Sequence, residues 1–226
     1  MPINPTLKLY YDFSITRGPE PMYGLGPTLT EVGSPTYDAS GVSLDGSTQY
    51  LHSSDVTWFD GGEGVMYVAG SLDDVTVDAN LNAFLVFSAS NNRFVLLFGK
   101  TSNEGWSYIE SPAGVQFNHA HDLGDWSNGE LHRWGHFYET NNCKAAQDGT
   151  SGSQDTSFAA LSSLSTLRIG ADHNGTPGNL WNGYIKEVRY YDSVDGGTGS
   201  AGNFVRDLTN GLIREAVTGI MQTGVG

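Results

Sequence analysis

The segment Leu180-Trp181-Asn182-Gly183-Tyr184-Ile185-Lys186-Glu187-Val188-Arg189-Tyr190-Tyr191 decides the fold. Between residues 184 and 191, apolar or aromatic side chains recur among charged ones, a pattern typical of a half-buried β-strand. Ile185, Val188 and Tyr190 supply the side chains that face a core. This segment therefore predicts a strand in a sheet with one buried face.

The same alternation recurs along the rest of the chain, with turn residues between the apolar runs. Further strands are expected at 7–12, 41–46, 49–52, 65–71, 83–88, 93–99, 106–109, 115–118, 133–139, 143–147 and 166–170. Residues 13–34 are rich in Gly and Pro, and residues 148–157 are small and polar, so both segments are expected to be loops. Many short strands joined by turns predict an all-β sandwich.

Length and composition agree with that architecture. The chain has 226 residues, 30 of them Gly, with 12% aromatic and 16% charged residues. An all-β sandwich of this length is commonly a single domain. The formal net charge of −14 disfavours nucleic acid and anionic membranes as partners, because phosphate binding needs clustered Lys and Arg. Cations, neutral glycans and basic protein surfaces stay possible partners. A strong net charge can also serve only to keep the protein soluble.

The last part of the chain has a different character. Residues 1–195 form the predicted sandwich domain, and residues 196–226 form a Gly-rich hinge followed by a helical tail. Apolar residues recur there at a spacing of four, as in one row of a helix: Phe204, Leu208, Leu212, Ala216 and Ile220. The favoured interpretation is a helix packed back on the sandwich. The alternative is a docking element for a neighbouring subunit, made by Phe204, Leu208, Leu212 and Ile220.

Three segments, in the order of the family, resemble the concanavalin A-like, laminin G-like superfamily. They are Val42–Leu51 with its Asp-Gly pair, Leu131–Thr140 leading to Gln147-Asp148-Gly149, and Leu167–Ala171 followed by Leu180–Tyr191. Gly170 and Gly183 in the last pair stand where the backbone bends or approaches another strand closely. The resemblance implies a two-sheet antiparallel jelly-roll sandwich with one concave sheet, here followed by a short C-terminal helical segment.

Catalysis is not expected. Glycosidases of this superfamily carry Glu-x-Asp-x-x-Glu on one strand, which places paired carboxylates on one face. That pattern does not occur in this sequence. Glu130 and Glu139 lie too far apart to share one strand face, and Glu187 stands between Lys186 and Val188. A polysaccharide hydrolase or lyase with unlinked carboxylates is the alternative.

No cofactor is expected, and calcium is the alternative that the resemblance suggests. Asp73, Asp74, Asp78 and Asn80 form an oxygen-rich cluster that calcium could use. Solvated turn residues are the favoured interpretation of that cluster. His119 and His121 would face the same side of a strand, as a zinc pair could require. Two exposed histidines at a loop edge are the favoured interpretation, because the spacing places no third ligand.

Two tryptophans are the candidates for glycan contact. Trp126 and Trp181 are both flanked by Gly, Asn, Asp or Ser, so both are expected in exposed polar loops. An aromatic ring there could stack on a sugar. Trp134 lies within an expected strand, where a core position is favoured.

The predicted function is a non-enzymatic structural or accessory protein of a virion, of the capsid-decoration or tail-fibre type, with glycan contact. Small domains of this superfamily that end in a helical tail resemble parts of bacteriophage particles, and residues 1–5 lack the features of a secretory signal. The expected partners are other virion proteins, further copies of the chain and surface glycans, with no nucleic acid and no membrane. The alternative is a free-standing lectin-like module.

Overall fold

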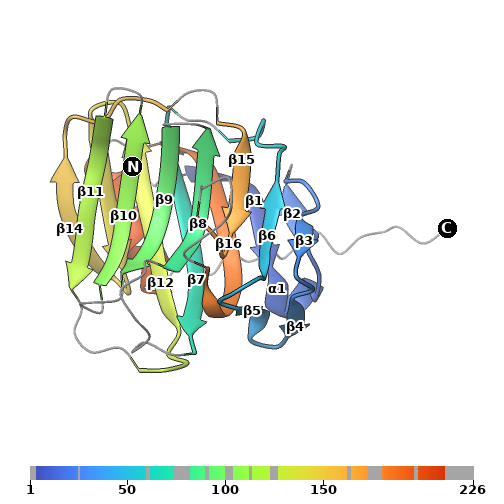
Figure 1. Cartoon of the computed structure of the whole chain (residues 1–226). Helices are drawn as coiled ribbons and strands as arrows, with labels where there is room; N and C mark the ends of the chain where they lie inside the picture. Colours follow the sequence, from blue (N-terminus) through green and yellow to red (C-terminus); the bar gives the residue numbers. More distant parts are fainter. Residues whose placement is uncertain are drawn as a thin grey trace.

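The protein is a sandwich of two antiparallel β-sheets (Figure 1). The computed structural model describes residues 4–24, 26–59, 62–73, 82–89, 92–99, 104–111, 114–122, 127–161, 164–172, 180–195 and 198–211. Within these residues only two short helices accompany the strands, α1 (Phe13–Thr16) and α2 (Thr198–Thr209). Neither helix has the length and apolar character needed to span a membrane. The predicted all-β architecture is confirmed.

The first sheet has nine strands in the described part of the chain. Its main path runs β14-β13-β12-β7-β16-β1-β2, and β5 adds to β16 and to β4. The bounds are β1 (Asn4–Asp12), β2 (Tyr23–Gly24), β4 (Thr36–Asp38), β5 (Gly41–Asp45), β7 (Gly64–Leu72), β12 (His132–Glu139), β13 (Asn142–Gln147), β14 (Thr150–Asp155) and β16 (Asn182–Asp195).

The second sheet has seven described strands in the order β11-β10-β9-β8-β15-β6-β3. The bounds are β3 (Thr30–Val32), β6 (Tyr50–Ser53), β8 (Asn82–Ala89), β9 (Asn92–Gly99), β10 (Glu104–Ser111), β11 (Gly114–Asp122) and β15 (Thr166–Ile169). Strands adjacent in the sequence often lie in different sheets, so the chain crosses repeatedly between the two layers.

Strand β16 supplies part of the core, as its sequence predicts. Ile185, Val188 and Tyr190 are fully buried in the cluster between the sheets. Residues three apart in a regular strand point to opposite faces. A register shift between Ile185 and Glu187, where β16 pairs with β7, adds one residue and brings Ile185 and Val188 to the same face.

Trp181 also lies in this core, and its predicted position in an exposed loop is wrong. Its side chain has 0% exposed surface, and its ring meets that of Trp134 edge-on at 6.4 Å. The indole Nε1 donates a hydrogen bond to the carbonyl oxygen of Ser71 at 3.1 Å. Trp181 lies directly before β16, which begins at Asn182, and the polar residues beside it do not show that the indole turns inward. A buried ring cannot stack on a glycan, so Trp181 is withdrawn as a contact residue.

Gly183 makes the close approach expected of it. Its φ is +141°, and a Cβ added there would lie 2.2 Å from the carbonyl oxygen of Ser71. Gly170 has a φ of +84°, in the left-handed region that favours glycine. Both positions require glycine for the backbone path that surrounds Trp181.

The C-terminal helix packs on the same chain. In α2, Phe204 and Leu208 are buried against Val65, Phe137 and Tyr191 on the outer face of the nine-stranded sheet. The Phe204 and Tyr191 rings meet edge-on at 5.2 Å. These two side chains therefore pack against their own chain, which corrects their assignment as docking residues for a partner. The favoured interpretation, a helix packed back on the sandwich, is confirmed. Leu212, Ala216 and Ile220 lie outside the described residues.

Two expected loops contain regular structure. Residues 150–155 form β14, which pairs with β13 at the edge of the nine-stranded sheet. Their small polar side chains lack the apolar alternation that marks a half-buried strand. This exposed edge strand is held instead by backbone hydrogen bonds to its neighbour. Residues 13–34 include α1, β2 and β3.

Candidate functional site

Both described helices pack mainly on strands of the nine-stranded sheet and not on the seven-stranded sheet. Helix α2 packs on β12, β13, β14, β16 and β7, and α1 packs on β1, β4, β5 and β16, all strands of the nine-stranded sheet. In Figure 1, strands β11, β10, β9 and β8 run side by side across one layer of the molecule. This layer is therefore a candidate surface for a ligand.

One row of backbone partners crosses all seven strands of this sheet. From edge to edge it runs Asn118, Tyr108, Val95, Val86, Arg168, His52 and Thr30. On either side of Arg168, Leu167 and Ile169 are fully buried in the core, as are Leu51 beside His52 and Ile109 beside Tyr108. Because side chains alternate along a strand, Arg168, His52 and Tyr108 lie on the outer face.

These outer side chains are half-buried and form two local groups. On β6 and β15, the Tyr50 and His52 rings lie 5.9 Å apart, and Arg168 is the cross-strand partner of His52. The Nη1 of Arg168 donates a hydrogen bond to the carbonyl oxygen of Asp172 at 2.6 Å, which holds the guanidinium in place.

The second group lies on β10. The hydroxyl of Tyr108 donates a hydrogen bond to Oε2 of Glu110 at 3.3 Å. Aromatic rings with polar tips can stack on an apolar sugar face, while guanidinium, imidazole and carboxylate groups bond to sugar hydroxyls.

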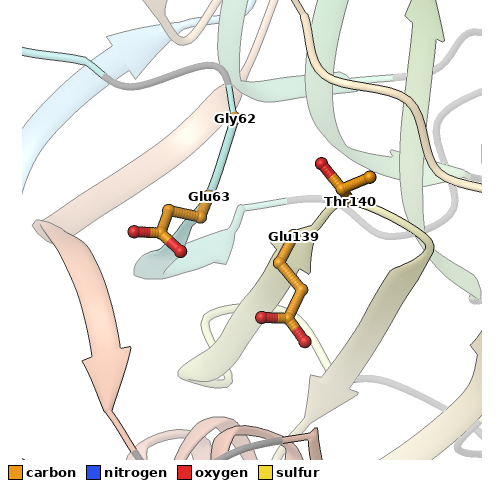
Figure 2. Close-up of a pocket in the computed structure, with 4 residues that line it drawn as sticks. All are labelled: Gly62, Glu63, Glu139 and Thr140. Carbon is orange, nitrogen blue, oxygen red and sulfur yellow. The ribbon is translucent and has the colours of Figure 1, made fainter.

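A pocket of about 400 Å³ lies at one end of the nine-stranded sheet, lined by Gly62, Glu63, Glu139 and Thr140 (Figure 2). Glu63 immediately precedes β7, and Glu139 ends β12. Because Gly64 pairs with Tyr138 in these antiparallel strands, Glu63 and Glu139 lie opposite one another. This brings together two carboxylates that are 76 positions apart in the sequence.

Glu139 is held in a fixed orientation. Its Oε1 accepts a hydrogen bond from Nδ2 of Asn142 at 2.6 Å, and Oδ1 of Asn142 accepts one from Nε2 of Gln154 at 2.7 Å. Like charges directly opposite in a sheet are destabilising. A pair of carboxylates could bond to ligand hydroxyls or act as acid and base in glycoside hydrolysis.

The buried thiol offers no nucleophile. Cys143 is fully buried, with its Sγ 2.8 Å from Nε2 of His136. Burial raises the pKa of the Cys143 thiol well above its usual value, and the nearby Asp155 carboxylate adds to the shift. The residue therefore stays a thiol at neutral pH, as expected of a small core side chain.

Several predicted site residues lie partly or wholly outside the described structure. Asp73 is exposed directly after β7, whereas Asp74, Asp78, Asn80 and Trp126 lie outside the described residues. His119 and His121 belong to strand β11, not to a loop edge. Among the described side chains, no group of three or more His, Cys, Asp or Glu could hold a metal ion. Calcium binding by Asp73 and its neighbours stays the alternative to solvated turn residues.

A further polar cluster lies on the outer face of the nine-stranded sheet beside α2. Glu187 and Arg189 form an ion pair with 2.7 Å between Oε2 and Nη2. The guanidinium lies over the rings of Tyr10 and Tyr67, at 4.8 and 5.3 Å from their centroids. The Tyr67 hydroxyl donates to Oε1 of Glu187 at 2.9 Å. The side chains of Arg189 and Glu187 are only 11% and 13% exposed, so this cluster is structural.

Sequence reasoning missed both candidate surfaces. Tyr50, His52, Arg168 and Tyr108 lie on strands that the sequence predicts, and strand alternation marks them as outward-facing. Nothing in the sequence shows that β6, β15 and β10 belong to one sheet. In the sequence, the nearest preceding glutamate to Glu139 is Glu130, whereas its neighbour in the fold is Glu63.

Comparison with known proteins identifies the fold. No protein-family model matches the chain, and no curated protein matches it. Domain 4 of AbnA, an extracellular GH43 arabinanase of Geobacillus stearothermophilus solved with arabinotriose, matches with a TM-score of 0.68 and 14% identity. The match covers 91% of this chain and 98% of that domain.

Two further solved structures share the fold. A Trypanosoma rangeli sialidase matches with a TM-score of 0.64 and 12% identity, over 92% of this chain and 33% of the sialidase. The CBM40 of a Ruminococcus gnavus sialidase, bound to sialyllactose, matches with a TM-score of 0.52 and 11% identity, over 66% of this chain and 83% of that one. These similarities confirm the β-sandwich fold, which the chain shares with domains of glycoside-processing enzymes and with a carbohydrate-binding module.

Proposed function

We propose that the protein is a carbohydrate-binding domain that holds a glycan on the outer face of the seven-stranded sheet. The observation that carries the proposal is the placement of Tyr50, His52, Arg168 and Tyr108 on one sheet face while both described helices pack on the other sheet. The likeness to an arabinanase domain solved with arabinotriose, over nearly the full length of both chains, supports it.

The chemistry of this face suits sugars. Tyr50 and Tyr108 offer rings whose apolar bodies can pack on a pyranose or furanose face. Arg168 supplies planar hydrogen-bond donors, and its bond to the Asp172 carbonyl lowers the entropy lost when a ligand binds. A set of rigid aromatic and polar groups is the usual composition of a small-molecule site.

The proposal is tested by affinity electrophoresis in gels that contain arabinan, xylan, β-glucan or pectin. We expect at least one polysaccharide to retard the protein, and Tyr50→Ala or Arg168→Gln to reduce the retardation. Tyr23→Ala is the matched control, because Tyr23 is 38% exposed on the opposite sheet. Equal retardation of all variants would show that the glycan binds elsewhere, and absence of retardation in all four gels would count against glycan binding.

Glycoside hydrolysis is a second candidate, favoured by the two glutamates, Glu63 and Glu139, that line one pocket. Its test is reducing-sugar release from the same polysaccharides by the wild type, Glu63→Gln and Glu139→Gln. Release that both substitutions abolish would support an enzyme. Glu20→Gln, a substitution of an exposed carboxylate away from the pocket, is the control. If no reducing sugar is released from any of the polysaccharides, the result would agree with the prediction that the protein is not an enzyme.

The structural role in a virion stays a prediction. A glycan-binding face would suit a particle component that contacts a surface polysaccharide, but the solved structures named above come from glycoside-processing enzymes. The native mass of the full chain in solution tests this role. A defined oligomer is expected of a fibre or decoration protein, and a monomer would favour the free-standing lectin-like module.

A further inference from the structure

Five described polar or aromatic side chains on the seven-stranded sheet form two local groups. Tyr50, His52 and Arg168 form one group on the neighbouring strands β6 and β15, which we call the arginine group. Tyr108 and Glu110 form a second group on β10, which we call the tyrosine group. A single ligand that uses the whole face must contact both groups.

The register of the sheet gives the separation of the two groups. Arg168 pairs with Val86, Val86 with Val95, and Val95 with Tyr108, so three inter-strand steps separate Arg168 from Tyr108. At a strand spacing of about 4.8 Å, these steps place the two backbones about 14 Å apart. A single sugar ring is much smaller than this distance and can contact only one group.

We propose that this face binds the interior of an extended glycan chain, with consecutive sugars lying across the strands from the arginine group to the tyrosine group. This inference rests on the proposed function. A row of cross-strand partners, with both groups on one face, suits a linear polymer that lies on the sheet more than it suits a chain end held in a closed pocket. The arabinanase domain that shares the fold was solved with a trisaccharide.

Two contacts made by one chain reinforce each other. Once the arginine group holds one sugar, the tyrosine group meets the next sugars at a high effective concentration. Affinity should therefore rise with chain length until the chain reaches both groups and then level off. Contact with the second group should strengthen binding by about tenfold or more.

The test is calorimetric titration with arabino-, xylo- and cello-oligosaccharides, each series running from the monosaccharide to the hexasaccharide. We expect the wild type to bind one series with an affinity that rises at least about tenfold with length and then levels off. Tyr108→Ala should remove that rise and leave the weak binding of the shortest ligands unchanged. Tyr23→Ala, on the other sheet, should behave like the wild type, and circular dichroism of each variant verifies folding.

The outcomes separate this inference from the proposed function. Affinity that does not change with length, or a length dependence that persists in Tyr108→Ala, would overturn the extended-chain inference and leave glycan binding intact. Failure of every oligosaccharide to bind, together with a lack of retardation by any polysaccharide, would overturn both.

Discussion

The ion pair of Glu187 and Arg189 allows a direct test of what holds the outer face of the nine-stranded sheet together. Oε2 of Glu187 accepts hydrogen bonds from Nε and Nη2 of Arg189 at 3.2 and 2.7 Å, and Oε1 accepts one from Tyr67. The two charged side chains are 11% and 13% exposed. Replacement of Glu187 by Gln removes the negative charge and preserves the volume, so Arg189 keeps its place without a counterion.

The magnitude follows from the burial of the pair. Removal of one partner from a buried ion pair costs about 3–5 kcal/mol, because the remaining charge stays desolvated. The amide oxygen of Gln can still accept one hydrogen bond, and the rings of Tyr10 and Tyr67 still flank the guanidinium. Both effects place the expected loss of unfolding free energy at the lower end, about 3 kcal/mol.

The assay is urea-induced unfolding followed by tryptophan fluorescence, with Tyr67→Phe as a control. The Phe substitution removes one hydrogen bond to Glu187 and should cost about 1.5 kcal/mol. The double substitution Glu187→Gln with Arg189→Met should recover part of the loss, because no unpaired charge remains. A loss below about 1 kcal/mol for Glu187→Gln would refute the reasoning, since that is the range of an exposed ion pair.

Three further substitutions test other parts of the fold. Gly183→Ala should destabilise the protein by about 2 kcal/mol or more, because its φ is +141° and the new Cβ would meet the carbonyl oxygen of Ser71, and an unchanged melting temperature would contradict this. Phe204→Ala should cost about 3 kcal/mol in urea unfolding, since the ring is buried under α2, whereas a neutral result would mean that the helix is not docked on the sheet in solution. At Asp45, burial opposes ionisation, but hydrogen bonds from the backbone of residues 47–49 and from the Thr48 hydroxyl lower the carboxyl pKa well below its usual value. The folded pKa lies below the unfolded value, so the stabilisation is present above about pH 4 and is lost as the pH falls. The stability difference between wild type and Asp45→Asn should therefore narrow below that pH, and a difference that is constant with pH would count against it.

Strand positions could be predicted from the sequence because one face of most strands is buried. In β16, the apolar character of Ile185, Val188 and Tyr190 is enough to predict that they are buried. Strand β14 could not be found in this way, since its Ser, Thr, Gly and Gln residues are held by pairing with β13. Two residues of the predicted apolar row, Phe204 and Leu208, lie in α2, and their packing in cis was the simpler of two alternatives. The helix begins at Thr198, inside the segment expected to be a Gly-rich hinge.

The candidate sites depend on pairings between segments far apart in the sequence. Arg168 and His52 are neighbours only because β15 pairs with β6, and Glu63 meets Glu139 only because β7 pairs with β12. Trp181 shows the reverse case. The polar residues around it favour an exposed loop, whereas its buried indole donates a hydrogen bond to the carbonyl oxygen of Ser71, 110 positions away.

The central claim is that a glycan binds on the outer face of the seven-stranded sheet. The most direct measurement is the change in backbone amide chemical shifts of the isotope-labelled protein on titration with arabinotriose, xylotriose and cellotriose. We predict that the perturbed amides cluster at residues 50–52, 108–110 and 166–168 for at least one of these sugars. Perturbations confined to residues 62–64 and 139–140 would assign the glycan to the carboxylate pocket and contradict the claim, as would the absence of any shift with all three sugars.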